Sequence, residues 1–241
     1  MKFSDQGIII NIKNYGEYSA IVKLITKDHG ICCAFVKYAK SKKVKTTYQI
    51  GNLISFEYRS RVDDNLGSLF SVDLIRYCLS NILFEKSKLD CVRCLFYIID
   101  KAFLENESQY LLFSQLSDFL DDMNYQDIEF DKIIANYIKL ELSILDILGY
   151  GVDLSECVVT KNSENLAFVS PKSARAVCYD AGLPYKDKLL SLPIFLIKNC
   201  DNLKKSDLMD GLKLSGYFLT KYVFVDNEQF TKNRSLISKS I

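Results

Sequence analysis

The chain has 241 residues, of which 49% are hydrophobic, 25% charged and 12% aromatic, and this globular composition excludes a disordered or fibrous protein. The net charge of +1 does not by itself indicate a partner. The single histidine, His29, excludes H-E-x-x-H zinc sites and other metal sites that need a histidine pair.

The first third of the chain predicts short strands. Three β-branched runs separated by turn sequences are followed by two runs in which apolar and polar residues alternate, at residues 8–12, 20–26, 31–36, 54–58 and 69–74. In the last run we expect Phe70, Val72 and Leu74 to share the buried face. Five short strands predict a small antiparallel barrel, and five is the strand count of the OB-fold, which often binds oligonucleotides.

Positive charge is concentrated in this first part. Residues 1–80 contain 12 lysines and arginines against 7 acidic residues, whereas residues 81–241 contain 19 against 23. Five lysines fall between the third and fourth predicted strands: Lys37, Lys40, Lys42, Lys43 and Lys45. A basic module joined to a mildly acidic one is expected where one half meets a polyanion, although such runs also occur in solvated loops.

Aromatic residues flank these lysines, as single-strand binding requires, because cations neutralise phosphates and rings stack on exposed bases. We predict the five lysines as phosphate contacts, with Arg59 and Arg61 as second choices. Tyr48 and Tyr58 are candidate stacking residues, although tyrosines on strands more often pack at the core or its rim. Five phosphate contacts on a single strand predict a log–log salt slope of about −3.5.

The rest of the chain predicts helices. Apolar residues recur at spacings of three and four over residues 130–148, and less sharply over 81–104, 108–124 and 206–225. The sequence therefore predicts an α+β protein, with an OB-fold barrel over residues 1–80 and a mainly α-helical domain over 81–241.

A short helix is also predicted over residues 171–181, with Ser170 as its cap and Pro171 as its first residue. On this helix Lys172, Arg175 and Tyr179 would share one face, which is a candidate phosphate contact. The ordinary interpretation of such a face is a solvated helix surface.

No residue pattern predicts catalysis. The chain lacks the phosphate-binding G-x-x-x-x-G-K-[ST] sequence and the G-x-S-x-G nucleophile sequence. The Cys91-x-x-Cys94 pair lies in an apolar helical pattern, which favours buried structural thiols over a zinc or redox site. No run approaches the roughly 20 apolar residues of a membrane span, and the first residues do not match an export signal. We expect a cytoplasmic protein that is not an enzyme, needs no metal or cofactor and does not contact membranes.

Several short segments match one family in order and spacing over most of residues 1–225. The most specific are LDILGYGVDL at 145–154, VSPKSARAVC at 169–178 and LLSLP at 189–193, and the earlier segments are at 7–10, 15–19, 24–30, 51–53 and 56–59. Together they resemble the RecO family of bacterial recombination mediators. The resemblance implies an N-terminal OB-fold and a helical C-terminal domain.

The resemblance also implies a role in DNA repair and recombination after DNA damage. Members bind single- and double-stranded DNA, anneal complementary strands, and work with RecR to load RecA onto strands coated by single-strand-binding protein. They contact the acidic C-terminal tail of that protein, which requires a basic side chain beside an apolar pocket. This role implies that the chain is cytoplasmic and associated with the nucleoid.

Some family members bind zinc through two C-x-x-C pairs, in the region that corresponds here to about 155–182. In this sequence Thr160 and Ala181 stand where the second cysteine of each pair would follow Cys157 and Cys178. Two thiolates do not complete a tetrahedral structural site, so we expect no zinc.

Two alternatives to the mediator role stay open. One is an interaction adaptor whose barrel binds protein partners, with incidental DNA contact. The other is an RNA-binding OB-fold protein, since the same surface physics serves RNA.

Overall fold

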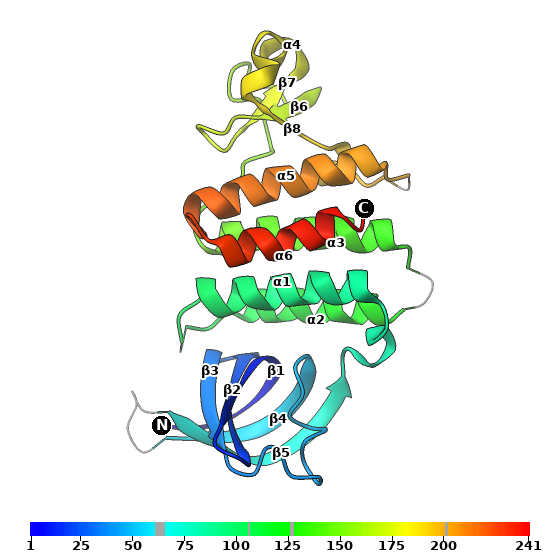
Figure 1. Ribbon diagram of the computed structural model, residues 1–241. Coiled ribbons are helices and arrows are strands. Elements are labelled where there is room, and N and C mark those ends of the chain that lie inside the picture. Colours follow the sequence, from blue (N-terminus) through cyan, green and yellow to red (C-terminus); the bar gives the residue numbers. More distant parts are fainter. Residues whose placement is uncertain (61–65, 106, 126–127, 201) are drawn as a thin grey trace. The chain divides into compact units, whose positions relative to one another are not determined.

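Five strands occupy the first part of the chain, where the sequence predicts them (Figure 1). The computed structural model describes residues 1–60, 66–105, 107–125, 128–200 and 202–241. The strands are β1 (Lys2–Tyr15), β2 (Ser19–Thr26), β3 (Gly30–Val36), β4 (Asn52–Arg59) and β5 (Gly67–Tyr77). They close into a barrel in the order β1-β2-β3-β5-β4, in which only the short β3–β5 pairing is parallel.

The barrel is held together by inward-facing aliphatic and aromatic side chains. Val22, Leu24 and Ile54 are fully buried, and Phe56 is 2% exposed. Burying each side chain of this size contributes about 1.5–3 kcal/mol before the opposing chain entropy. The alternation of apolar and polar residues in the sequence therefore corresponds to side chains that face the inside and the outside of the barrel.

Strand β5 departs from the predicted alternation. Ser71 has a φ of +47°, and an extra β5 residue enters the ladder with β4 at this point. Such a bulge shifts the phase of the strand by one residue. Leu69 is therefore buried ahead of the bulge, whereas Phe70 is 44% exposed. The expectation that Phe70 shares the buried face with Val72 and Leu74 is wrong.

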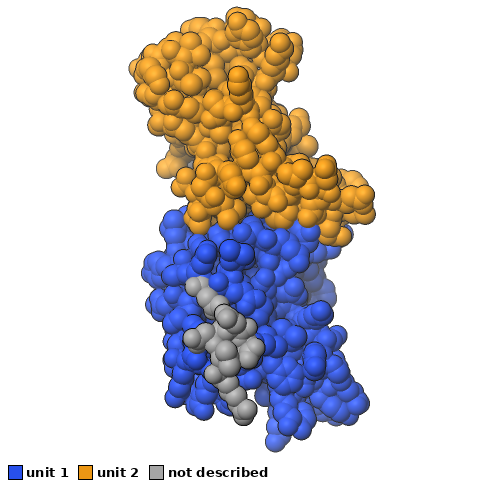
Figure 2. Space-filling view, turned by 90° about the vertical axis from the view of Figure 1, so that its left-hand side faces the viewer, with its two compact units in different colours: residues 1–126 blue, residues 127–241 orange. Residues whose placement is uncertain are grey.

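Contacts divide the chain into two compact units, Met1–Gln126 and Asp127–Ile241 (Figure 2). The first unit holds the barrel, the 3-10 turn η1 (Ser80–Ile82), α1 (Lys86–Ala102) and α2 (Tyr110–Asn124). These helices agree with those predicted over 81–104 and 108–124. The sequence-based boundary near residue 80 marks the change from strands to helices, and the first two helices group with the barrel by contact.

The described part of the second unit contains three long helices: α3 (Phe130–Ile147), α5 (Lys205–Tyr222) and α6 (Glu228–Ser238). α3 ends where predicted, because Gly149 adopts a φ of +82°, a conformation in which side chains other than glycine's are strained. The sequence analysis missed α6, whose buried side chains are only Phe230, Asn233 and Ile237. The α+β class predicted from the sequence is confirmed by the two units together.

A small three-stranded sheet completes the second unit. Its strands, in the order β7-β6-β8, are β6 (Leu166–Val169), β7 (Ala176–Cys178) and β8 (Leu190–Ser191). The short α4 (Tyr179–Gly182) follows β7, and the 3-10 turns η2 (Leu183–Lys188) and η3 (Ile194–Leu196) flank β8.

The helix predicted over residues 171–181 is wrong. Residues 170–175 form the turn of a β6–β7 hairpin, in which the Ser170 N–H donates to the Arg175 carbonyl at 2.9 Å, and β7 and the start of α4 follow. The Ala174 N–H donates to the Ser170 carbonyl at 2.9 Å, and Ala174 has a φ of +53° that no helix allows. Serine and proline begin turns as readily as helices, so the cap signal was ambiguous.

Among the described residues, no helix combines the length and the apolar character that crossing a membrane would need.

Candidate nucleic-acid interface

The lysine run lies on the segment that connects β3 to β4. All five predicted lysines are exposed, whereas Ala39 is 4% exposed and faces the barrel core. The buried Asn52 side chain donates to the Thr46 and Thr47 carbonyls at 2.7 and 3.0 Å. Apolar anchors and a buried amide therefore fix the backbone of the segment while its cations face water.

This segment is tied to the β1–β2 turn. The Lys40 N–H donates to the Tyr18 carbonyl at 3.1 Å, and Lys40 Nζ donates to the Gly16 carbonyl at 3.2 Å. Within the described ranges, no acidic side chain forms an ion pair with any of the five lysines. Their positive charge is therefore not neutralised by an acidic partner there.

The second-choice arginines differ in position. Arg59 pairs with Glu57 at 2.6 Å and lies 4.6 Å from the ring centroid of the exposed Phe70. Its charge is therefore partly compensated. Arg61 lies outside the described residues.

The two candidate stacking tyrosines pack inward. Tyr58 is 6% exposed, stacks on Phe3 with ring centroids 4.9 Å apart, and its hydroxyl accepts the Gly67 N–H at 3.1 Å. Tyr48 is half-buried against the barrel core. Burial raises the pKa of both hydroxyls. Tyr58 therefore packs in the barrel core, which is the alternative that the sequence analysis gave for strand tyrosines.

Sequence reasoning counted Tyr38 among the aromatic residues that flank the lysines, but it selected none of three exposed tyrosines there as stacking candidates. Tyr15 is 60% exposed, and Tyr18 and Tyr38 are each 54% exposed. Tyr15, the last residue of β1, and Tyr18 both belong to the tyrosine-rich stretch around the β1–β2 turn, and attention to the composition of this stretch would have found them. Their orientation depends on the turn and could not be read from strand periodicity.

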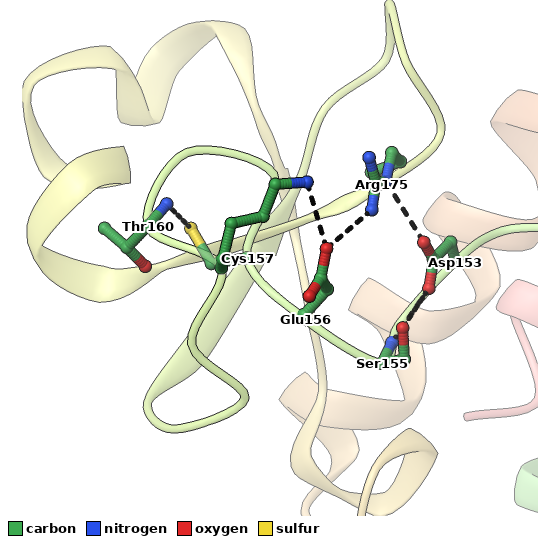
Figure 3. A network of polar contacts seen from close by, with 7 residues as sticks. Asp153, Ser155, Glu156, Cys157, Thr160 and Arg175 are labelled. Carbon is green, nitrogen blue, oxygen red and sulfur yellow. Dashed lines mark hydrogen bonds and ion pairs between the residues drawn. The ribbon is translucent and has the colours of Figure 1, made fainter.

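The face predicted to bind phosphate in the second unit does not lie on a helix, because Lys172 and Arg175 belong to the β6–β7 hairpin turn. Arg175 Nε lies 3.1 Å from Asp153, and its Nη2 lies 3.0 Å from Glu156 (Figure 3). Glu156 also pairs with Lys161 at 3.0 Å. The carboxylates of Asp153 and Glu156 therefore compensate the charge of Arg175. Of the two predicted cations, Lys172 is the one that is exposed, in the hairpin turn.

The Cys157 and Cys178 segments meet in the structure. Cys157 Sγ accepts the N–H groups of Thr160 at 3.5 Å and Cys178 at 3.2 Å, and Thr160 Oγ1 lies 3.7 Å from Cys178 Sγ. Burial opposes ionisation of Cys157, but hydrogen bonds from Thr160 and from neighbouring backbone N–H groups outweigh it and lower the pKa of this thiol to about 6.

These residues do not fit a structural zinc site. Such a site needs four nitrogen or sulfur ligands, and here two positions are held by Thr160 and Ala181. No cluster of three or more histidine, cysteine, aspartate or glutamate side chains occurs in the part of the chain that the structure describes. Hydrogen bonds to sulfur connect the two segments instead.

Cys91 and Cys94 are fully buried on α1, as are Leu95 and Ile98. Their burial agrees with the predicted structural role.

Comparisons with known proteins agree over nearly the whole chain. Residues 1–78 match the family described as "Recombination protein O N terminal", and residues 88–228 match "Recombination protein O C terminal". A protein of Ehrlichia chaffeensis named DNA repair protein RecO is 37% identical over 100% of this chain and 98% of its own length. Proteins of the same name from Rickettsia bellii and Rickettsia typhi are 34% and 33% identical, over 95% and 98% of this chain and 92% and 98% of their own lengths.

Proposed function

The chain belongs to the RecO family of DNA repair proteins, and from this membership we propose that it is a recombination mediator that binds DNA and anneals complementary strands. It binds single- and double-stranded DNA through its barrel and works with RecR to load RecA onto strands coated by single-strand-binding protein. Its site of action is the nucleoid in the cytoplasm.

One observation carries this proposal: five exposed lysines without acidic partners in the described ranges, on a single segment of an OB-fold barrel. Annealing makes and breaks no covalent bond. A cationic surface reduces the repulsion between two phosphate backbones, and base pairing supplies the driving force. The chain therefore needs no catalytic group for this role.

The number of phosphate contacts predicts how strongly DNA binding depends on salt. Five phosphate contacts on a single strand correspond to a log–log salt slope of about −3.5. Affinity then falls about 100-fold between 50 and 200 mM salt. Binding is expected to be insensitive to sequence, because contacts to phosphate carry no base information.

The tail of single-strand-binding protein is proposed to dock on the second unit, in a groove between α5 and α6. Leu212, Tyr217 and Phe230 supply an apolar floor, and Lys213 and Lys221 lie at its edge. A basic edge beside an apolar floor complements an acidic peptide that ends in a hydrophobic residue.

Annealing of two complementary oligonucleotides coated with single-strand-binding protein tests the mediator role. The variant in which all five run lysines become alanine is expected to lose annealing and most of the salt dependence of DNA binding. The matched control removes the same charge from exposed lysines of the second unit: Lys132, Lys139, Lys186, Lys188 and Lys204.

The alternatives predict different outcomes. Absence of annealing by the wild type, with tight binding to a protein partner, would support the adaptor. Stronger binding to RNA than to DNA of the same sequence would support the RNA-binding protein. The mediator role is supported if the wild type and the control variant anneal the strands and the variant without the five run lysines does not.

A further inference from the structure

Three tyrosine rings protrude from the barrel next to the lysine run. Tyr15 ends β1, Tyr18 closes the β1–β2 turn, and Tyr38 follows Lys37 at the start of the segment that carries the lysines. Each ring is more than half exposed. Large aromatic side chains are usually buried in the protein or in contact with a partner. Three exposed rings on two adjoining turns therefore indicate a ligand-binding surface.

The backbone places these rings together. Lys40 bonds the β1–β2 turn twice, through its N–H to the Tyr18 carbonyl at 3.1 Å and through Nζ to the Gly16 carbonyl at 3.2 Å. The Tyr15 ring meets Phe35 of β3 edge-on, with centroids 5.6 Å apart. These hydrogen bonds hold the β1–β2 turn against the start of the lysine segment.

Tyr38 is held in an unfavourable backbone conformation. Its φ is +59°, which is uncommon for residues other than glycine and is costly for a bulky side chain. The next residue, Ala39, faces the core, so this conformation keeps the Tyr38 ring in solvent. Lys37 Nζ lies 5.0 Å from the centroid of the same ring, which joins a cation to the aromatic surface.

We infer that Tyr15, Tyr18 and Tyr38 form a stacking surface for the unpaired bases of single-stranded DNA, whose phosphates are bound by the neighbouring lysines. The inference rests on the proposed DNA-binding function. Rings accept any base on their faces, and the lysines fix the strand by its backbone, so the combination is tolerant of sequence.

Abasic DNA separates stacking from phosphate contact. Affinities of the full chain are measured for an oligothymidine and for an abasic oligonucleotide of the same length, across a range of salt concentrations. The variant Y15L/Y18L/Y38L is expected to bind the oligothymidine at least tenfold more weakly than the wild type. Its affinity for the abasic strand and its salt slope are expected to be unchanged, because the lysines remain.

The matched variant Y15F/Y18F/Y38F keeps the rings and removes only the hydroxyls. It is expected to bind the oligothymidine as the wild type does. The five-lysine variant is expected to lose affinity for both oligonucleotides and to lose salt dependence. Melting temperatures of all variants establish that they are folded, and the single variants Y18L and Y38L provide the test if the triple leucine variant is not.

Three results would overturn the inference: equal losses on abasic and normal strands, equal losses in the leucine and phenylalanine variants, or no loss in the leucine variant. Each leaves the proposed function standing if the wild type still binds DNA with a steep salt slope. Absence of salt-dependent binding by the wild type would instead refute the proposed function itself.

Discussion

Replacing Thr160 and Ala181 by cysteine should give the second unit a zinc site. The geometry is already close, because Thr160 Oγ1 lies 3.7 Å from Cys178 Sγ. A tetrahedron with zinc–sulfur bonds of 2.3 Å has edges of about 3.8 Å. A sulfur in place of the Thr160 hydroxyl would therefore stand near ligand distance from the Cys178 sulfur with little movement of the chain.

The expected stabilisation follows from binding to the folded state alone. At a zinc concentration 100 times the dissociation constant, the free energy of unfolding rises by about 2.7 kcal/mol. For a chain of this size that corresponds to a rise in Tm of roughly 5–10 °C. The T160C/A181C variant is purified under reducing conditions, its metal content is measured by mass spectrometry, and its Tm is recorded with and without a chelator.

The control T160S/A181S changes the same positions without adding thiols. It should bind no zinc, and its Tm should not respond to the chelator. One zinc per chain in the wild type, or none in a folded T160C/A181C protein, would refute the reasoning.

Two further predictions concern buried or partly buried charge. Arg234 pairs with the fully buried Glu141, so R234A should lower the free energy of unfolding by about 3–5 kcal/mol in urea titrations. The double variant R234A/E141Q should recover part of this loss, because it removes the unpaired buried carboxylate. Equal losses in the single and the double variant would show that this carboxylate is not the cause. Burial opposes ionisation of Asp100, but Lys23 at 2.9 Å and Lys101 at 3.1 Å together outweigh it and hold the pKa of this carboxyl below its usual range. The ionised form therefore stabilises the fold above the ordinary pKa of about 3.9, and this stabilisation is lost as the pH falls through the lower folded value. D100N should weaken the acid dependence of urea midpoints between pH 5 and pH 2, and an unchanged dependence would contradict the assignment.

Periodicity was sufficient to predict most elements of this chain. Strands and long helices bury one side, so the sequence repeats with the geometry of the element, as in β2 and α3. What periodicity cannot encode is an interruption. The bulge at Ser71 depends on how β5 meets β4, and it exposes Phe70 where simple alternation would bury it.

The candidate site shows the same division. Exposed lysines can be read from the sequence, because a run of charges has to face solvent. The orientation of an aromatic ring cannot, since tyrosine suits both a core and a surface. Tyr58 is buried by its pairing with Phe3, and Tyr15 is exposed by its place at the turn, although both belong to strands. At residues 170–175 the tertiary hairpin overrode a local helix signal.

The way β1 is shared between two partners has a consequence for synthesis of the chain. Its second half pairs with β2, which follows directly, but its first half pairs with residues of β4 that are translated some fifty positions later. Until then the nascent protein presents an open strand edge, the kind of surface that recruits other unfinished chains. Asp5 lies on that edge and ends up buried with its carboxylate bonded to His29. Charged side chains on an open strand edge oppose pairing with other chains, and Asp5 stands on this edge until β4 covers it.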